Sequence, residues 1–196
     1  METISKVQSW RTVDLIYCGV FATLMMIGAN ITSIVPFLTV GGVPITLQTF
    51  FAVLAGLILG SKKGAIACTV YMLIGLAGAP VFSGFKGGIS SILSPTFGFI
   101  ITFILCAYVA GLIVERFKTR KSYIIAALFA TFLNYILGTN WMYGAYKLWF
   151  AAPEGFSYQL AWLWMIPPMP KDFVLAIFAS ILAYRLQKTL KIIPIK

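Results

Sequence analysis

Long apolar stretches without charge set the architecture of this chain. Five of the stretches that hold no Asp, Glu, Lys or Arg are 15–61, 64–85, 87–114, 122–146 and 173–184. A helix needs about 20 largely apolar residues to cross the hydrocarbon core of a bilayer. The first stretch, with 47 residues, holds two helices joined by the Pro- and Gly-marked segment "SIVPFLTVGGVPITLQ". The last, with 12, needs the upstream "LAWLWMIPPMP" to reach spanning length.

The pattern therefore predicts an all-α integral membrane protein, with six transmembrane helices packed as a single membrane-embedded domain over residues 1–196. The expected helices are 13–32, 46–61, 64–80, 95–115, 122–139 and 164–186. Composition agrees with this prediction: 60% of residues are hydrophobic, 10% are charged and the mean hydropathy is +0.94. These values lie well outside the usual range for a soluble domain.

Basic residues predict the orientation of the bundle. The connections on the side of the N-terminus hold twelve of them: Lys6, Arg11, Lys62, Lys63, Arg116, Lys118, Arg120, Lys121, Arg185, Lys188, Lys191 and Lys196. The opposite side holds only Lys86, Lys147 and Lys171. By the positive-inside rule we expect both termini to face the cytoplasm. The net charge of +10 then reflects topology and contact with anionic lipid. It does not indicate nucleic acid, because the charges are divided among short loops.

The chemistry that the chain lacks excludes several functions. There is no histidine, and the acidic residues are Glu2, Asp14, Glu115, Glu154 and Asp172. Intramembrane proteases and metal enzymes need histidine or clustered carboxylates, so we expect neither an enzyme nor a metal site. No phosphate-binding loop occurs, so the chain does not hydrolyse ATP. Three cysteines lie in apolar stretches without CxxC spacing and are expected to be core residues: Cys18, Cys68 and Cys106.

Polar groups gather in three segments on the outer side. The segment 77–99 holds five glycines and two prolines and is too long for a tight turn. A second segment, "GGVPITLQTF", places Thr46 and Gln48 where a helix begins. The third precedes Asp172. Non-helical backbone at membrane depth must be buried or line a cavity, so these segments predict a capped binding pocket.

Lys171 and Asp172 stand at the head of an apolar run that ends at Arg185. One interpretation is structural: Pro170 pre-sets a helix start, and Asp172 in the first turn suits the positive end of the helix dipole or pairs with Lys171. The other is a ligand site. Asp172 precedes Arg185 by 13 residues, about 20 Å of helix. If Arg185 marks the inner boundary of a hydrocarbon core about 30 Å thick, Asp172 lies several Å below the outer surface.

The energies favour the ligand site. A charge at that depth costs roughly 2.5–3.5 kcal/mol, which exceeds the return from a helix-dipole contact of about 0.3–1 kcal/mol. Pairing with Lys171 is expected to offset only part of this cost, because adjacent helical residues point about 100° apart.

A second polar pair supports that interpretation. "FLNYILGTNW" places Asn134 and Tyr135 in the middle to outer half of a predicted helix. An asparagine in a membrane span can also be a link between helices. An amide, a phenol, a carboxylate and an ammonium group that open into one aromatic-rich pocket would suit a small ligand with urea- or amide-like edges and an anionic tail.

Small residues at four-residue spacing predict close helix packing. The pairs are Cys18/Ala22, Gly19/Thr23, Gly56/Gly60, Ala176/Ser180 and Ala179/Ala183. For each pair, packing within the chain is one interpretation. The small face of the first helix is continuous, and we predict that Cys18, Gly19, Ala22 and Thr23 bind a partner protein.

Four segments together carry a family resemblance. "VPITLQTFFAVLAGLILGSKKGA", "YMLIGLAGAPVF", "SPTFGF" and "PKD" occur in order along nearly the whole chain. They resemble the BioY family, the biotin-binding S components of energy-coupling factor (ECF) transporters. The resemblance implies a six-helix subunit in the plasma membrane of a prokaryote. It would capture biotin from outside and work with a module of one transmembrane protein and two ATPases, without a cofactor of its own.

The resemblance also suggests roles for the candidate residues. Asp172 would accept hydrogen bonds from the ureido N–H groups, with Asn134 and Tyr135 completing that polar end. Lys171 or Lys86 would meet the carboxylate, while the ring system would pack on Phe82 and Trp164. The 77–99 segment would act as a lid, and Thr46, Gln48 and Gly84 are further predicted substrate-binding residues.

The sequence departs from the family pattern at two motifs, and two alternative functions remain open. The chain reads S-P-T-F-G-F where the family usually has G-P-T-G-G-Y. It has P-K-D-F-V-L where the family usually has P-G-D-x-x-K, so Leu175 replaces the lysine and Lys171 replaces the glycine. The alternative functions are an S component for another vitamin and a non-transporting assembly subunit, which ligand binding by the purified protein distinguishes.

Overall fold

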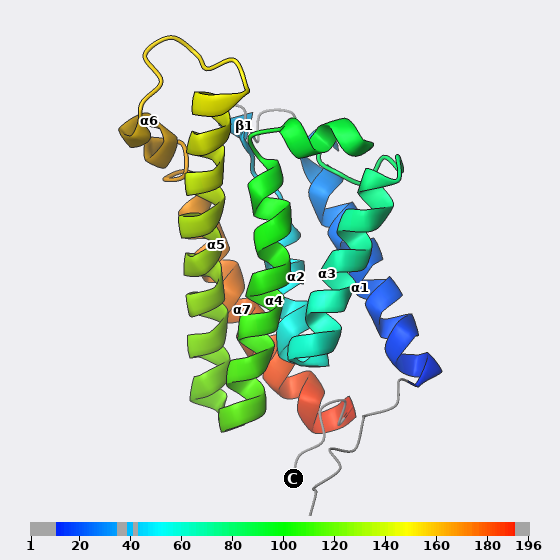
Figure 1. Ribbon diagram of the computed structural model, residues 1–196. Coiled ribbons are helices and arrows are strands. Elements are labelled where there is room, and N and C mark those ends of the chain that lie inside the picture. Colours follow the sequence, from blue (N-terminus) through cyan, green and yellow to red (C-terminus); the bar gives the residue numbers. More distant parts are fainter. Residues whose placement is uncertain (1–10, 35–38, 41–42, 191–196) are drawn as a thin grey trace, which may run out of the picture.

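The computed structural model describes residues 11–34, 39–40 and 43–190, which form a bundle of helices packed side by side (Figure 1). Its elements, in chain order, are α1 (Thr12–Ile34), β1 (Thr39–Val40), β2 (Val43–Pro44), α2 (Gln48–Leu59), α3 (Ser61–Leu76), the 3-10 helix η1 (Ile89–Leu93), α4 (Phe97–Phe117), α5 (Arg120–Leu148), α6 (Tyr158–Leu163) and α7 (Pro168–Leu190). The strands β1 and β2, of two residues each, pair antiparallel and form a hairpin. The fold is therefore almost entirely helical.

Each predicted helix corresponds to an observed one, with shifted ends. Three described helical segments are long and apolar enough to cross a membrane: Thr12–Ile31, Phe97–Phe117 and Arg120–Leu148. The helix predicted to end at 139 continues to Leu148, and α6 was not predicted. The helix predicted for 46–61 is a 12-residue α2, only about 18 Å long, which is shorter than the hydrocarbon core.

The break between α2 and α3 lies at Gly60, not at the lysine pair. Gly60 has φ of +87°, a conformation that favours glycine, so two helices meet there at a single residue. Lys62 and Lys63, placed in the connection by their charge, belong to the first turn of α3. The backbone N–H and Oγ of Ser61 donate to the Glu115 carboxylate, each at 2.8 Å, and so tie this elbow to α4.

Close approach of small residues holds the elbow against α4. A Cβ added to Gly56 would lie 2.2 Å from the Ala107 carbonyl oxygen, and one added to Gly111 would lie 2.2 Å from the Ser61 nitrogen. The predicted pairs on α7 behave in the same way, since Ala176, Ala179, Ser180 and Ala183 are all buried. Here the small residues serve packing within the chain, in line with the first of the two interpretations.

The two ends of the bundle differ in charge. Figure 1 shows the start of α1, the α2–α3 elbow, the α4–α5 connection and the end of α7 at one end, which we call the basic end. Nine described basic residues lie in these segments: Arg11, Lys62, Lys63, Arg116, Lys118, Arg120, Lys121, Arg185 and Lys188. The opposite end holds the hairpin, α6 and the segment 77–96, with Lys86, Lys147 and Lys171. The predicted basic residues Lys6, Lys191 and Lys196 lie outside the described residues.

Candidate functional site

A cavity of about 1030 Å³ lies at the end of the bundle opposite the basic end. The hairpin, the segment after α3, and the near ends of α2, α4, α5 and α7 enclose it. Short α2 begins at its floor, with Gln48. Nine of the predicted ligand residues line this cavity: Thr46, Gln48, Phe82, Gly84, Lys86, Asn134, Tyr135, Lys171 and Asp172. Segments distant in sequence thus converge on one space.

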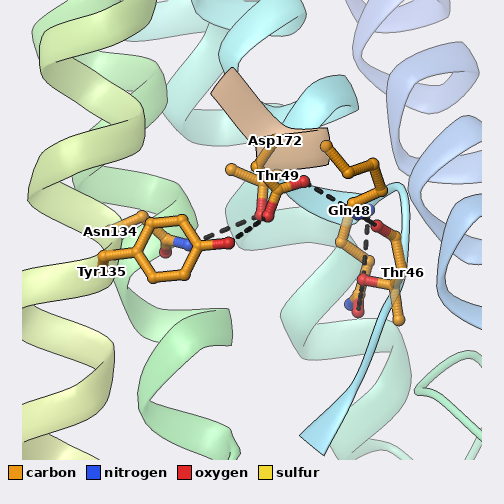
Figure 2. Close-up of polar contacts among 7 residues, drawn as sticks. Thr46, Gln48, Thr49, Asn134, Tyr135 and Asp172 are labelled. Carbon is orange, nitrogen blue, oxygen red and sulfur yellow. Dashed lines mark hydrogen bonds and ion pairs between the residues drawn. The ribbon is translucent and has the colours of Figure 1, made fainter. Parts of the chain in front are cut away.

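Asp172 makes two short polar contacts in the cavity wall. Its side chain is 7% exposed, and its Oδ2 accepts a 2.6 Å hydrogen bond from the Tyr135 hydroxyl. Its Oδ1 lies 2.8 Å from Nζ of Lys171 and accepts no other bond among the described residues. Figure 2 shows Tyr135 reaching from α5 toward Asp172 on α7. One carboxylate oxygen therefore accepts a hydrogen bond from the Tyr135 hydroxyl, and the other is held only by the ion pair with Lys171.

Two sequence arguments about Asp172 need correction. Helix α7 begins at Pro168, so Asp172 lies in the second turn and does not serve the helix start. The angle of about 100° between adjacent helical residues also does not keep the two groups apart, because the long Lys171 side chain brings its Nζ to 2.8 Å from Oδ1 of Asp172. Lys171 and Asp172 form an ion pair, and both residues line the cavity.

Lys171 joins α7 to the segment that precedes α2. Besides Asp172, its Nζ donates to the backbone oxygen of Thr46. The Thr46 hydroxyl in turn donates to Oε1 of Gln48 at 3.0 Å (Figure 2). This end of the cavity is therefore a connected polar wall.

The Asn134 amide is held by two threonines. Its Oδ1 accepts from the Thr102 hydroxyl at 2.5 Å, and its Nδ2 donates to Oγ1 of Thr49 at 3.4 Å. The link joins α5 to α4 and α2, so the interhelical role anticipated for this asparagine is present. Asn134 also borders the cavity, together with Thr49, which sequence reasoning missed.

Tyr71 is a second residue that sequence reasoning missed. It is fully buried, accepts a 2.8 Å hydrogen bond from Nε2 of Gln48, and donates to the Val81 carbonyl at 3.1 Å. Its ring meets that of Phe82 edge-on, with centroids 5.6 Å apart. A single tyrosine in an apolar helix gave no spacing signal, yet it connects the cavity floor to the segment above.

Trp164 lies behind the cavity wall and does not line the cavity. Its ring packs on Phe156 at 5.4 Å and on Tyr146 at 6.0 Å, and Tyr146 is the ring that borders the cavity. The apolar wall comes instead from Phe82 and from phenylalanines of α4, Phe99 and Phe103. The prediction that Trp164 touches a ligand in this cavity is not supported by its position.

The predicted partner face on α1 divides into two halves. Cys18 and Ala22 are 3% and 2% exposed, and the Cys18 thiol lies 3.5 Å from the Lys63 carbonyl oxygen. Both therefore pack within this chain and are closed to another protein, which corrects half of the predicted face. Gly19 and Thr23 are exposed, and a Cβ added to Gly19 would meet nothing within 4 Å.

The charges in the cavity wall favour an anionic ligand. Lys171 and Asp172 balance each other, and Lys86 at the exposed edge adds one positive charge. No cluster of three potential metal ligands occurs among the described residues. The cavity can therefore bind a ligand by hydrogen bonds to the paired carboxylate, the phenol and the amides, and by packing against aromatic rings.

The fold and cavity define a multi-pass helical membrane protein with a large pocket at one end of its bundle. The BioY family model matches residues 2–192, and the chain belongs to the BioY family. A crystal structure of the S-component for biotin from an ECF-type ABC transporter has the same fold, with a TM-score of 0.75 at 22% identity. That match covers 92% of this chain and 95% of the other.

Named relatives agree with this assignment. The putative biotin transporter BioYB of Bacillus subtilis is 44% identical over 180 residues, covering 91% of this chain and 89% of the relative. The probable biotin transporter BioY of Pyrococcus horikoshii is 39% identical over 169 residues, covering 86% and 93%. The biotin transporter BioY of Thermotoga maritima is 33% identical over 176 residues, covering 89% and 96%.

Proposed function

We propose that this chain is the biotin-binding S component of an ECF-type transporter, capturing biotin for uptake without altering it chemically. Its relatives are named biotin transporters, and the matched crystal structure is of a biotin S-component. The observation that carries the proposal is the Tyr135–Asp172–Lys171 cluster, which presents a buried, paired carboxylate to a cavity with one further lysine. No catalytic residue is assigned.

Biotin would lie with its ureido ring at this cluster. Oδ1 of Asp172, held only by the ion pair, is free to accept a ureido N–H, and a charge-assisted bond of this kind contributes about 1.5–3 kcal/mol. The Asn134 and Gln48 amides border the same end. The fused rings and chain would contact the phenylalanines. Lys86 would meet the carboxylate, because Lys171 is already occupied by Asp172 and the Thr46 carbonyl.

The membrane arrangement is proposed on length and charge. We infer one domain over residues 1–196 with six spans, α1 to α5 and α7, in a prokaryotic plasma membrane. Twelve-residue α2 fits this count because the cavity occupies the depth that the helix leaves open. The basic end would face the cytoplasm and anionic lipid, with both termini there and the cavity outside.

The energy source would be a separate ECF module of one transmembrane protein and two ATPases, since the chain has no phosphate-binding loop. The exposed small residues Gly19 and Thr23 offer a site for close approach by its membrane helices. Gly19→Trp should abolish uptake in cells that hold the module and leave biotin binding by the isolated subunit intact. Loss of both activities, or of neither, would place the docking face elsewhere.

Titration calorimetry of the purified chain tests the ligand. Biotin should bind at a ratio near one, whereas thiamine, riboflavin and other vitamins should give no heat under the same conditions. Binding of another vitamin in preference to biotin would favour an S component of different specificity. No binding of any vitamin would favour an assembly subunit.

A further inference from the structure

A short closed turn forms the boundary between the cavity and its exterior. Phe82 and Lys86 exchange backbone hydrogen bonds of 2.9 Å and 3.2 Å, which close residues 82–86 into one unit, the 82–86 turn. All five residues of the turn line the cavity. Phe82 is buried, whereas Phe85 is 61% exposed. The turn therefore faces the pocket on one side and the exterior on the other.

The 82–86 turn contains an unfavourable backbone conformation. Phe85 has φ of +54°, a region that bulky residues rarely adopt. Such a residue persists where surrounding contacts hold it. The contact here is a 2.7 Å hydrogen bond from the Phe85 backbone N–H to Oδ1 of Asn30 on α1.

Asn30 holds the turn at a second point. Its Nδ2 donates to the Val81 carbonyl at 3.4 Å, next to the start of the turn, and also to the Met26 carbonyl at 3.0 Å within α1. Tyr71 donates to the same Val81 carbonyl and accepts from Gln48 on the cavity floor. Asn30 is 8% exposed, does not line the cavity and lies in a predicted span where no role had been assigned to it.

We infer that Asn30 is a positioning residue for ligand retention: its amide holds the 82–86 turn over the cavity through the Phe85 N–H and the Val81 carbonyl. The inference rests on the proposed function only in taking biotin as the retained ligand. Because Asn30 touches the turn and not the pocket, it acts on how long the cavity stays closed. Its loss should speed biotin release while leaving the approach of biotin nearly unchanged.

Hydrogen exchange of single backbone amides, measured in the full-length, ligand-free protein, tests the hydrogen bond between Phe85 and Asn30. The Phe85 amide should exchange far more slowly than an unstructured amide in wild type. In Asn30→Ala the Phe85 amide should exchange about tenfold faster. This is the increase expected from the loss of one hydrogen bond, the one that it donates to the Asn30 side chain. Asn140→Ala is the matched control, because that amide also donates to the carbonyl four residues earlier, Ile136, at 2.8 Å. It should leave Phe85 unchanged.

Release of labelled biotin chased with excess unlabelled biotin tests the consequence. Asn30→Ala should raise the dissociation rate about tenfold with an association rate close to wild type. A purely structural role would instead lower the fraction of protein that binds and leave the dissociation rate of the remainder unchanged, which would overturn the inference. Unchanged Phe85 exchange would overturn it as well.

Two further results keep the tests decisive. If Asn30→Ala does not fold, Asn30→Ser retains a bond to the Met26 carbonyl but is too short for Phe85, and should give the same two effects. A fast-exchanging Phe85 amide in wild type would refute the inference without any variant. If wild type fails to bind biotin, the proposed ligand is wrong, while amide exchange still decides whether Asn30 holds the turn.

Discussion

Two buried aspartates, one at each end of the bundle, each pair with a lysine but lie in different surroundings. Asp14 on α1 is 2% exposed and lies 2.7 Å from Nζ of Lys63, while Asp172 is 7% exposed and lies 2.8 Å from Nζ of Lys171. Among the described residues, Oδ1 of Asp172 is held by Lys171 alone, whereas Oδ1 of Asp14 also lies 3.7 Å from the Arg11 guanidinium. Asp14 occupies the first turn of its helix and accepts the Arg11 backbone N–H at 3.1 Å. Asp172 borders the cavity and accepts a phenol.

The comparison shows that burial and ion pairing do not by themselves mark a ligand site. Asp14 fits the structural interpretation that the sequence had suggested for Asp172, since it closes the start of α1 against α3. What distinguishes Asp172 is the open volume beside it, together with the converging side chains of α2 and α5. Changes at the two aspartates should therefore affect different properties, stability at one end and ligand binding at the other.

The largest effect should follow removal of a lysine. Lys171→Ala leaves the buried Asp172 charge without its counterion, and we expect a loss of unfolding free energy near 3 kcal/mol, with biotin binding abolished. Lys63→Ala should cost less, about 1–2 kcal/mol, because Asp14 keeps the Arg11 N–H and the Arg11 guanidinium at 3.7 Å.

Thermal unfolding in detergent and calorimetry on the folded fraction would measure both variants. Equal losses of stability, or loss of biotin binding in Lys63→Ala, would remove the distinction between the two ends.

A tenfold loss of biotin affinity is expected when the Tyr135 hydroxyl, which bonds to Asp172 and has no counterpart at Asp14 in the described part of the chain, is removed. Tyr135→Phe removes the 2.6 Å bond to Asp172 and keeps the ring, which lies 6.3 Å from that of Phe173. The carboxylate then loses a charge-assisted bond of roughly 1.5–3 kcal/mol, and biotin should bind about tenfold more weakly. Tyr123→Phe on the same helix, away from the cavity, is the control and should bind as wild type. Equal affinities for both variants would exclude Tyr135 from the site.

The smallest effect should come from an exposed charge. Lys86→Ala removes the lysine at the cavity edge, and an exposed ion pair with the biotin carboxylate contributes only about 0–1 kcal/mol. Affinity should therefore fall by a factor of up to about five at low ionic strength and less at high salt. Lys62→Ala, an exposed lysine at the basic end, should change nothing. A loss in Lys86→Ala that is large and independent of salt would mean that Lys86 is desolvated by the ligand.

Much of the fold was predictable because the physical signal is long and redundant. Charge-free runs located every major helix, and the basic residues separated the two ends. Prediction failed where one residue decides the geometry: Gly60 breaks α2 from α3, although the neighbouring lysines had suggested a longer connection. The extension of α5 to Leu148 and the short α6 lie in an aromatic region whose composition suits helix and loop alike.

The candidate site was predictable to the extent that polar residues stand out in an apolar chain. Asp172, Asn134 and Gln48 were noticed for this reason, and the structure brings them to one cavity. Tyr71, Thr49 and Asn30 were missed because their importance comes from contacts across helices, which no local spacing reveals. Trp164 was misplaced because aromatic character alone does not tell a cavity wall from the layer behind it.

The most direct test of this account is a calorimetric comparison of Asp172→Asn with Asp14→Asn, each titrated with biotin after purification of the folded protein. The account predicts that Asp172→Asn weakens binding by about tenfold or more, since the amide is a poorer acceptor than the carboxylate, while Asp14→Asn binds biotin as wild type and loses only thermal stability. Wild-type affinity in a folded Asp172→Asn protein would contradict the account and make Asp172, like Asp14, a structural ion pair.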